Sequence, residues 1–551
     1  MSELHNHNSD PTQRCAVQEH NGENCGKNSG AGVPSLARRY AFKLLSNMVG
    51  VPLFLLMEAV LPRALGPAAY GAFSYSTGIF QYLTNFLDFG ASTCLFTTLA
   101  KRRSEWPLLA FFLRLSLLIL LLCLLFAGLC LLPPAAAWLM PGVPAWVMPF
   151  AALWAFATWG VRVLRGVNDA LGQTVESEKA RTIAGVLACV ALLALHLAGV
   201  LSLPVLFVHQ LVYLGGMILA FKVIVLEGFR QPDGKAPPLA LAPEARRAYT
   251  REFVAYSLPL LLQVSIVTLT LTADRWLLQM FDGNVEQAYF SLSQKVGMAC
   301  FLFVAAMTPL LTRELAVAHG RNDFAEMGRL FASFAPLLYA VAAYFSAFAC
   351  LEAATVLNLF GGSEFAAALP VVQLMTLYPI HQGYGQLTQA VYYASARTGA
   401  LSKITVISSL SGLFASLLLL LPREYGGLGL GAEGLALKML LIQFITANVM
   451  LFMCSRFIPL PLPRLFSHQC ICLGLFLGLA WGVGEAWQYI TAAVGSSLLP
   501  LTGLPGLLVG FCLRGLVYSL AVALLCLAFP WLIGFSHAEL KGLLGRFRRK
   551  P

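Results

Sequence analysis

Long apolar segments recur along almost the whole length of this chain of 551 residues. A helix needs about 20 mostly apolar residues to cross the hydrocarbon core of a bilayer, and about fourteen segments meet that requirement. They predict spans at residues 40–62, 70–98, 106–132, 143–167, 179–200, 203–227, 252–281, 287–312, 328–356, 366–394, 401–421, 433–456, 468–490 and 508–534. Hydrophobic residues make up 58% of the chain and charged residues only 11%, which excludes a soluble globule. The predicted fold is an all-α polytopic membrane protein.

Lysine and arginine are distributed unequally between the two sides of this pattern. Of the 37 basic residues, only Arg63 and Arg423 fall in the connections on one side. Short cytoplasmic loops carry an excess of Lys and Arg. We therefore expect both termini to be cytoplasmic and the protein to lie in the cytoplasmic (inner) membrane. The net charge of +11 reflects this topology, so we predict no nucleic-acid partner.

Two sequence echoes indicate an internal repeat. The segment GPAAYGAFSYSTGIF follows the first predicted span, and NVEQAYFSLSQKVGM follows the seventh. A second pair consists of NDALGQTVESEKARTI and SARTGALSKITVI. Because six spans is an even number, the two copies would enter the membrane in the same orientation, as parallel repeats. Chance similarity among helices rich in Leu, Ala and Gly is the alternative.

The repeat suggests a division of the chain into six parts. We expect a disordered cytoplasmic tail (1–38), a six-helix bundle (39–228), a cytoplasmic linker (229–251), a second six-helix bundle (252–458), an additional helix pair (459–535) and a basic cytoplasmic tail (536–551). His and Cys residues in the first tail match no zinc-binding spacing, so no metal or other cofactor is predicted.

One face of the second predicted span is polar. Its residues at helical spacing are Ser74, Gly78, Gln81, Asn85, Asp88 and Ser92. Such a stripe either joins helices by hydrogen bonds or lines a water-filled cavity. Asp88 favours the cavity because helix packing does not require a charge. We predict that Gln81, Asn85 and Asp88 contact substrate.

The tenth predicted span has a similar face. Tyr378, Gln382, Gln386, Gln389 and Tyr393 share it, while Pro379, Gly383 and Gly385 are expected to interrupt the helix. Broken helices near the midplane mark binding sites in transporters. Amides and aromatic rings together suit a hydroxyl-rich ligand, which makes Gln382 and Gln386 candidate ligands. A kinked structural helix is the alternative.

Ionisable residues inside spans are the strongest functional signal, because each costs about 2.5 to 3.5 kcal/mol at mid-bilayer unless a cavity or a partner receives it. The candidates for substrate contact are Arg162, Arg165, Asp274, Arg275 and Lys295. Lys295 lies too deep to reach the surface easily. Arg162 and Arg165 either anchor the cytoplasmic end of their span or contact substrate. Asp274 and Arg275 either contact substrate or form an ion pair with each other near the outer surface.

Three further intramembrane charges have competing interpretations. Lys438 lies close to the outer end of its span, so we expect its side chain to extend toward that surface. Arg114 lies about two turns inside the third span, and Arg514 lies in the terminal pair. Like Arg162, each either anchors its span at the membrane surface or contacts substrate.

Two segments carry a family resemblance. They are LPRALGPAAYGAFSYSTGIFQYLTNFLDFGASTCLFTTLAKRR, from Leu61 to Arg103, and TADRWLLQMFDGNVEQAYFSLSQKVG, from Thr272 to Gly297. With them the chain resembles the oligosaccharide flippases of the multidrug/oligosaccharidyl-lipid/polysaccharide exporter superfamily over roughly residues 36–458. The resemblance implies two six-helix bundles around a V-shaped cavity, lined chiefly by spans one, two, seven and eight. It also implies that cationic residues of the cavity meet a pyrophosphate.

The function implied is translocation of a polyprenyl-pyrophosphate-linked oligosaccharide to the outer leaflet, for surface polysaccharide synthesis. Expected partners are the lipid-linked oligosaccharide, membrane lipids, polysaccharide polymerase machinery and a coupling ion, H⁺ or Na⁺. Such flippases often have twelve spans, and fourteen also suits the lipid II flippases of the same superfamily. A drug or cation antiporter is a further alternative, although the interior is mainly basic. A membrane polymerase, ligase or acyltransferase would need a large outer loop or a clustered catalytic site, and neither is visible in the sequence.

Overall fold

The computed structural model describes residues 36–102, 105–229, 241–494 and 503–539, and every regular element in those ranges is helical. The first half contains α1 (Leu36–Asp88), α2 (Ala91–Lys101), α3 (Trp106–Leu129), α4 (Pro133–Leu139), α5 (Val147–Leu171), α6 (Thr174–Leu197) and α7 (Leu203–Gly228). The second contains α8 (Pro243–Gly320), α9 (Phe324–Leu351), α10 (Ala353–Phe360), α11 (Leu369–Ala394), α12 (Thr398–Leu420) and α13 (Gly431–Cys454). The chain continues through α14 (Leu462–Val494) and α15 (Gly503–Ala528).

Eleven described helices are long and apolar enough to cross a membrane, and leucines, valines and phenylalanines on their outer faces are exposed. The molecule is therefore a multi-pass membrane protein. Two of the eleven, within α1 and α8, are 44 residues long, about twice what one crossing needs. The helix α11 is not among the eleven, although its 26 residues exceed one span. The count of fourteen stays a prediction.

Both long helices are hairpin-like pairs joined at a glycine. Gly66 interrupts α1 with φ of 70°, and Gly283 interrupts α8 with φ of 78°. Positive φ is readily available only to glycine, so each residue permits the sharp change of direction there. Gly66 is the first residue of one echoed segment and Gly283 directly precedes the other, which supports the predicted repeat.

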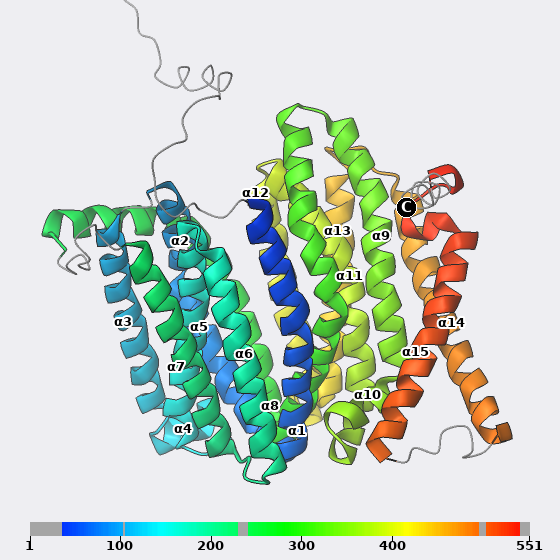
Figure 1. Ribbon diagram of the computed structural model, residues 1–551, viewed down its shortest axis with the longest axis horizontal. Coiled ribbons are helices and arrows are strands. Elements are labelled where there is room, and N and C mark those ends of the chain that lie inside the picture. The colour runs from blue at the N-terminus through cyan, green and yellow to red at the C-terminus, as the bar shows by residue number, and fades with distance from the viewer. Residues whose placement is uncertain (1–35, 103–104, 230–240, 495–502, 540–551) are drawn as a thin grey trace, which may run out of the picture.

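Figure 1 shows the helices in two groups. The helices α2 to α7 lie on one side and α9 to α13 on the other, with α1 and α8 between them. One large core of buried side chains fills the first group and continues into α8, α10 and α11, and two further cores lie in the second group. The pair α14 and α15 lies at the outer edge of the second group, against α9. There the Tyr339 hydroxyl donates to the Gln469 carbonyl oxygen at 3.1 Å, and Tyr344 and Ser519 hydroxyls lie 2.5 Å apart.

The structure corrects two expectations about local geometry. The second predicted span, 70–98, is broken at Phe89 and Gly90, which have φ of 44° and 80°. In contrast, α11 runs without a break through Pro379, so the predicted interruption is wrong. The helix α8 begins at Pro243, within the predicted linker 229–251, whose bounds stay a prediction. Residues 1–35, 230–240 and 540–551, with most of the predicted tails and the rest of the linker, lie outside the described residues.

Candidate functional site

A polar cavity of about 410 Å³ lies among both arms of α1, both arms of α8, and the helices α5 and α7. Its volume is within the range typical of small-ligand pockets. Its polar lining residues are Glu58, Ser74, Thr77, Gln81, Tyr82, Gln210, Arg275, Ser291, Gln294 and Lys295, and its apolar and aromatic lining includes Phe54, Leu61, Phe73 and Trp154. Gln81, Arg275 and Lys295, which the sequence singled out, meet here although they come from three separate helical arms.

Arg275 is held in this cavity by neutral groups. Its guanidinium donates to Gln287 Oε1 at 3.0 Å, to Ser291 Oγ at 2.8 Å and to Gln294 Oε1 at 2.8 Å. The guanidinium carbon also lies 4.5 Å from the centre of the Phe290 ring, a favourable cation–π contact. No carboxylate pairs with Arg275 among the residues that the structure describes. Its positive charge is therefore oriented but not neutralised.

Lys295 in the same cavity has a partner that neutralises it. Its ammonium donates to Glu58 Oε2 at 2.5 Å and lies 5.2 Å from the centre of the Tyr70 ring. The Lys295 side chain is 28% exposed and that of Glu58 is 12% exposed, so the pair borders the cavity. With Arg275 uncompensated, the cavity wall carries a net positive charge.

A row of polar groups extends from the cavity toward the end of α1 that leads into the basic loops. Gln81 donates to Asn85 Oδ1 at 3.4 Å, and Arg162 of α5 donates to the same oxygen at 2.6 Å. Arg162 is exposed and forms no ion pair with a described carboxylate. A second uncompensated guanidinium thus lies about one helical turn from the cavity.

Asp88, predicted to contact substrate, does not line the cavity. Its carboxylate accepts from the Ser92 backbone N–H at 3.1 Å and from the Ser92 hydroxyl at 2.7 Å. Because an acceptor before the first turn satisfies otherwise unpaired N–H groups, Asp88 stabilises the start of α2. The break at Gly90 places it in this role, which the helical spacing of the stripe did not reveal.

Asp274 also lies outside the cavity lining, and its partner is Lys438 of α13. The Lys438 ammonium donates to Asp274 Oδ2 at 2.5 Å, and the Ser416 hydroxyl donates to Oδ1 at 2.5 Å. Lys438 and Asp274 side chains are only 7% and 6% exposed. The expectation that Lys438 extends to the surface is therefore wrong, and so is an Asp274–Arg275 ion pair. The buried pair joins α8, α12 and α13.

Arg165 has a structural partner as well. It donates through Nε and Nη2 to Glu178 Oε1, at 2.9 and 2.5 Å, and Arg181 donates to the other oxygen at 2.9 Å. Glu178 is 1% exposed. Arg181 also reaches Ser46 at 2.8 Å, so this cluster joins α1, α5 and α6.

The amides of α11 lie away from the cavity. Gln386 accepts a hydrogen bond from the Thr308 hydroxyl of α8 at 2.8 Å, and Gln382 is half-buried in the second half of the molecule. Neither lines the cavity that holds Arg275. The Gln386 hydrogen bond helps to join α11 to the second arm of α8.

Sequence reasoning missed several lining residues. Glu58 was visible as an ionisable residue within a span, but nothing in its neighbourhood indicated Lys295 as its partner. Gln210 and Trp154 come from α7 and α5 and belong to no polar stripe, so only the packing of the helices brings them to the cavity. Among the described residues, no group of His, Cys, Asp or Glu is arranged to hold a metal ion.

The α8 hairpin contacts the first half at the end of the molecule opposite the basic loops. Asn284, next to the α8 hairpin glycine, donates to the Gly142 carbonyl oxygen at 2.8 Å, and Gln279 donates to that of Pro141 at 2.7 Å. Trp276 donates to the Trp138 carbonyl oxygen at 2.7 Å. The backbones of α1 and α8 also touch at Gly71, where an added Cβ would lie 1.7 Å from the Asn284 oxygen. This "hairpin contact" closes one end of the interface beside the cavity.

The family described as "Polysaccharide biosynthesis protein" matches residues 36–313. Among solved structures, the chain is similar to one described as "Lipid II flippase MurJ, inward closed conformation". That match has a TM-score of 0.61 and 12% identity, and it covers 89% of this chain and 99% of that one. It is also similar to an inward-facing multidrug resistance MATE family transporter of the MOP superfamily, with a TM-score of 0.53 and 15% identity over 77% of this chain and 98% of that one. No curated protein matches the chain.

The family match covers half of the chain and includes both segments that carried the resemblance. The structural matches have low identity and show the fold, which is shared with a flippase and a transporter. They confirm the predicted all-α multi-pass fold. The chain belongs to the polysaccharide biosynthesis protein family, and it shares its fold with a lipid II flippase and a MATE family transporter.

Proposed function

We propose that this protein moves a polyprenyl-pyrophosphate-linked oligosaccharide from the inner to the outer leaflet of the cytoplasmic membrane. The observation that carries the proposal is Arg275, a guanidinium inside the membrane region with three neutral hydrogen-bond partners and no described carboxylate. An uncompensated charge there is costly unless an ion of opposite sign enters the cavity. Guanidinium groups bind phosphate oxygens strongly, often through two parallel hydrogen bonds.

The rest of the lining suits the sugar part of such a substrate. Gln81, Gln210 and Gln294 supply amide donors and acceptors for hydroxyl groups, while Tyr82 and Trp154 supply aromatic surface. A hydrated headgroup needs a polar path because burying unpaired polar groups in hydrocarbon costs several kcal/mol each. The polyprenyl tail has no such need and remains in the lipid.

The uncompensated arginines suggest a direction of entry. Arg162 lies toward the basic loops, and Asn85 and Gln81 connect it to the cavity that holds Arg275. The pyrophosphate meets Arg162 first and Arg275 second if it enters from the cytoplasmic side. Outward movement of an anion is favoured by an inside-negative potential, by about 2.3 kcal/mol per charge per 100 mV.

The test is transport by an Arg275 variant in proteoliposomes that contain a fluorescent lipid-linked oligosaccharide. Arg275→Gln removes the charge but keeps hydrogen-bonding groups, so we expect flipping to fall about tenfold or more. Arg275→Lys retains the charge without the planar guanidinium, so its flipping rate should lie between those of the unmodified protein and Arg275→Gln. Surface polysaccharide in a complemented null strain should follow the same order.

Arg329→Gln is the matched control, because Arg329 is 78% exposed and pairs with Glu326 far along the chain from the cavity residues. It should transport normally. Unimpaired flipping by Arg275→Gln would contradict the proposal. Arg275-dependent efflux of a fluorescent cation without flipping would instead favour a drug antiporter, and a preference for lipid II would favour a peptidoglycan precursor as cargo.

A further inference from the structure

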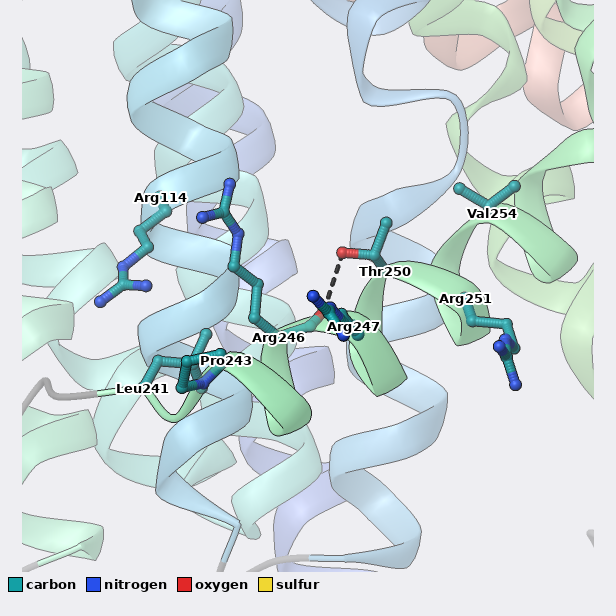
Figure 2. A pocket seen from close by; sticks show the side chains of 8 residues that line it. All are labelled: Arg114, Leu241, Pro243, Arg246, Arg247, Thr250, Arg251 and Val254. Carbon is teal, nitrogen blue, oxygen red and sulfur yellow. Dashed lines mark hydrogen bonds between the residues drawn. The ribbon is translucent and has the colours of Figure 1, made fainter.

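A second basic site lies apart from the central cavity, at the surface end of α3. A pocket of about 630 Å³ is lined by Arg114 of α3 and by Arg246, Arg247 and Arg251 of α8, together with Leu241, Pro243, Thr250 and Val254. Figure 2 shows Arg114 beside Arg246, with Arg247 and Arg251 further along α8. We call this site the arginine pocket. No acidic residue lines it.

The start of α8 lies across the ends of the neighbouring helices, as Figure 1 shows at the upper left, rather than parallel to them. Its inward face is apolar: Tyr249 and Phe253 are each 6% exposed, and both contact the Phe111 ring. Its other face carries the exposed Arg246, Arg247 and Arg251. An amphipathic helix of this kind, with a basic outer face, is typical of a segment in the membrane interface.

The four arginines have no carboxylate partner among the described residues. The nearby Glu105 and Glu252 are already occupied, because Arg102 pairs with both, at 3.2 and 2.6 Å. Glu105 also accepts from the Tyr249 hydroxyl at 2.9 Å. Glu244, in the first turn of α8, does not line the pocket. The arginine pocket therefore concentrates positive charge that local acids leave uncompensated.

The position of Arg114 indicates which anion compensates it. Arg114 lies eight residues into α3, about 12 Å along the helix axis. Around it the α3 surface faces lipid, with Leu113, Leu117, Leu118 and Leu121 from 46% to 57% exposed. An anion bound at Arg114 therefore borders an apolar surface, which suits a phospholipid with acyl chains along that surface better than a soluble phosphate.

We propose that the arginine pocket binds the phosphodiester headgroup of an anionic phospholipid from the surrounding leaflet, with its acyl chains along the exposed leucines of α3. Basic residues at a membrane surface each contribute about 1 kcal/mol toward anionic lipid. The bound lipid anchors the amphipathic start of α8, which continues directly into the arm that carries Arg275. The inference does not depend on the cargo of the central cavity.

The test is lipid binding by the full-length purified protein in detergent, measured by native mass spectrometry during titration with phosphatidylglycerol or phosphatidylcholine. We expect saturable binding of phosphatidylglycerol and no comparable binding of phosphatidylcholine. The R114Q/R246Q variant should bind phosphatidylglycerol about 30-fold more weakly. R114K/R246K should retain most of the affinity, and higher ionic strength should weaken binding because the arginines are exposed.

R313Q/R321Q is the matched control: it removes two exposed arginines at the other end of α8 and should bind normally. If R114Q/R246Q does not fold, R247Q/R251Q replaces it, because both of these side chains are exposed. Equal binding of the two phospholipids, or an equal loss in the control, would overturn the proposal. So would displacement of phosphatidylglycerol by millimolar inorganic phosphate, which indicates a soluble anion. Stoichiometric displacement by polyprenyl pyrophosphate would reassign the pocket to substrate entry.

Discussion

At the scale of residues, the partner of each intramembrane cation separates structural roles from binding roles. Lys438 pairs with Asp274 and Arg514 with Glu352, each at 2.5 Å, and Arg165 shares Glu178 with Arg181. Buried pairs of this kind cost much less than an isolated charge, so each joins helices without needing a ligand. Arg275 differs because only amides and a hydroxyl meet it. The absence of a described carboxylate partner, rather than depth in the membrane, is the reason we propose Arg275 as an anion-binding residue.

Glu58 provides a test in which a variant should gain affinity. Glu58→Gln removes the carboxylate that neutralises Lys295, so the cavity acquires a second uncompensated cation. We expect polyprenyl pyrophosphate to bind about tenfold more tightly, with slower release and lower turnover. The measurement is equilibrium binding of a fluorescent polyprenyl pyrophosphate to the purified variant.

The same substitution at Glu352 serves as its control, because Glu352 pairs with Arg514 at the terminal helices. Glu352→Gln should leave this affinity unchanged. Weaker binding by Glu58→Gln would show that Lys295 needs its carboxylate in order to be positioned, and would refute the charge argument.

At the scale of elements, the hairpins of α1 and α8 bring the two halves together. Each changes direction at a glycine with positive φ, Gly66 or Gly283, and the two touch where Gly71 meets the backbone of Asn284. A side chain at Gly71 would lie inside the van der Waals radius of the Asn284 oxygen, so only glycine permits this approach. The hairpin contact therefore depends on glycine at position 71, which has no Cβ, as well as on the hydrogen bonds around it.

Gly71→Val should open the hairpin contact. Because the valine side chain cannot fit against the Asn284 carbonyl, we expect the two halves to separate at that end and the cavity to become accessible there. A cysteine introduced at Ser291, which lines the cavity, should then react several-fold faster with an impermeant thiol reagent applied from outside. Peptide mass spectrometry would quantify the modification at that position alone.

Gly128→Ala on α3 is the comparison, because nothing lies within 4 Å of a Cβ at Gly128. It should leave the reactivity of the Ser291 cysteine unchanged. If Gly71→Val reacts no faster than this comparison, the hairpin contact does not close the cavity.

At the scale of the whole molecule, charge is distributed between two surfaces and an interior. The connections at one end carry most of the basic residues, the hairpin contact closes the other end, and the cavity between them holds Arg275. This arrangement suits a closed outer side and substrate entry from the basic side. The predicted sidedness of each connection can be measured with reporter proteins.

Reporter fusions test that topology. We expect a green fluorescent protein fused after Pro551 to fluoresce, because the distribution of basic residues predicts a cytoplasmic terminus. Alkaline phosphatase inserted after Tyr425, which is 68% exposed in the short element Arg423–Tyr425, should be active because the same distribution predicts that this connection lies outside. The reverse pattern of activity would invert the membrane orientation and, with it, the direction proposed for transport.

The sequence by itself determined the class of fold, the helical hairpins and the polar character of the interior. These features follow from local properties of the chain. The thickness of the bilayer sets the length of each apolar segment, and a backbone turn with positive φ favours glycine at that position. Only the tertiary structure decided which polar residues form a site. The break at Gly90 makes Asp88 a hydrogen-bond acceptor at the start of α2. Lys438 pairs with Asp274, and Glu58 of the first half pairs with Lys295 of the second. Electrostatic partners depend on distance in space, which the spacing of residues along one helix does not reveal. The packing of the helices therefore decided that Arg275 lines the cavity without a carboxylate partner among the described residues.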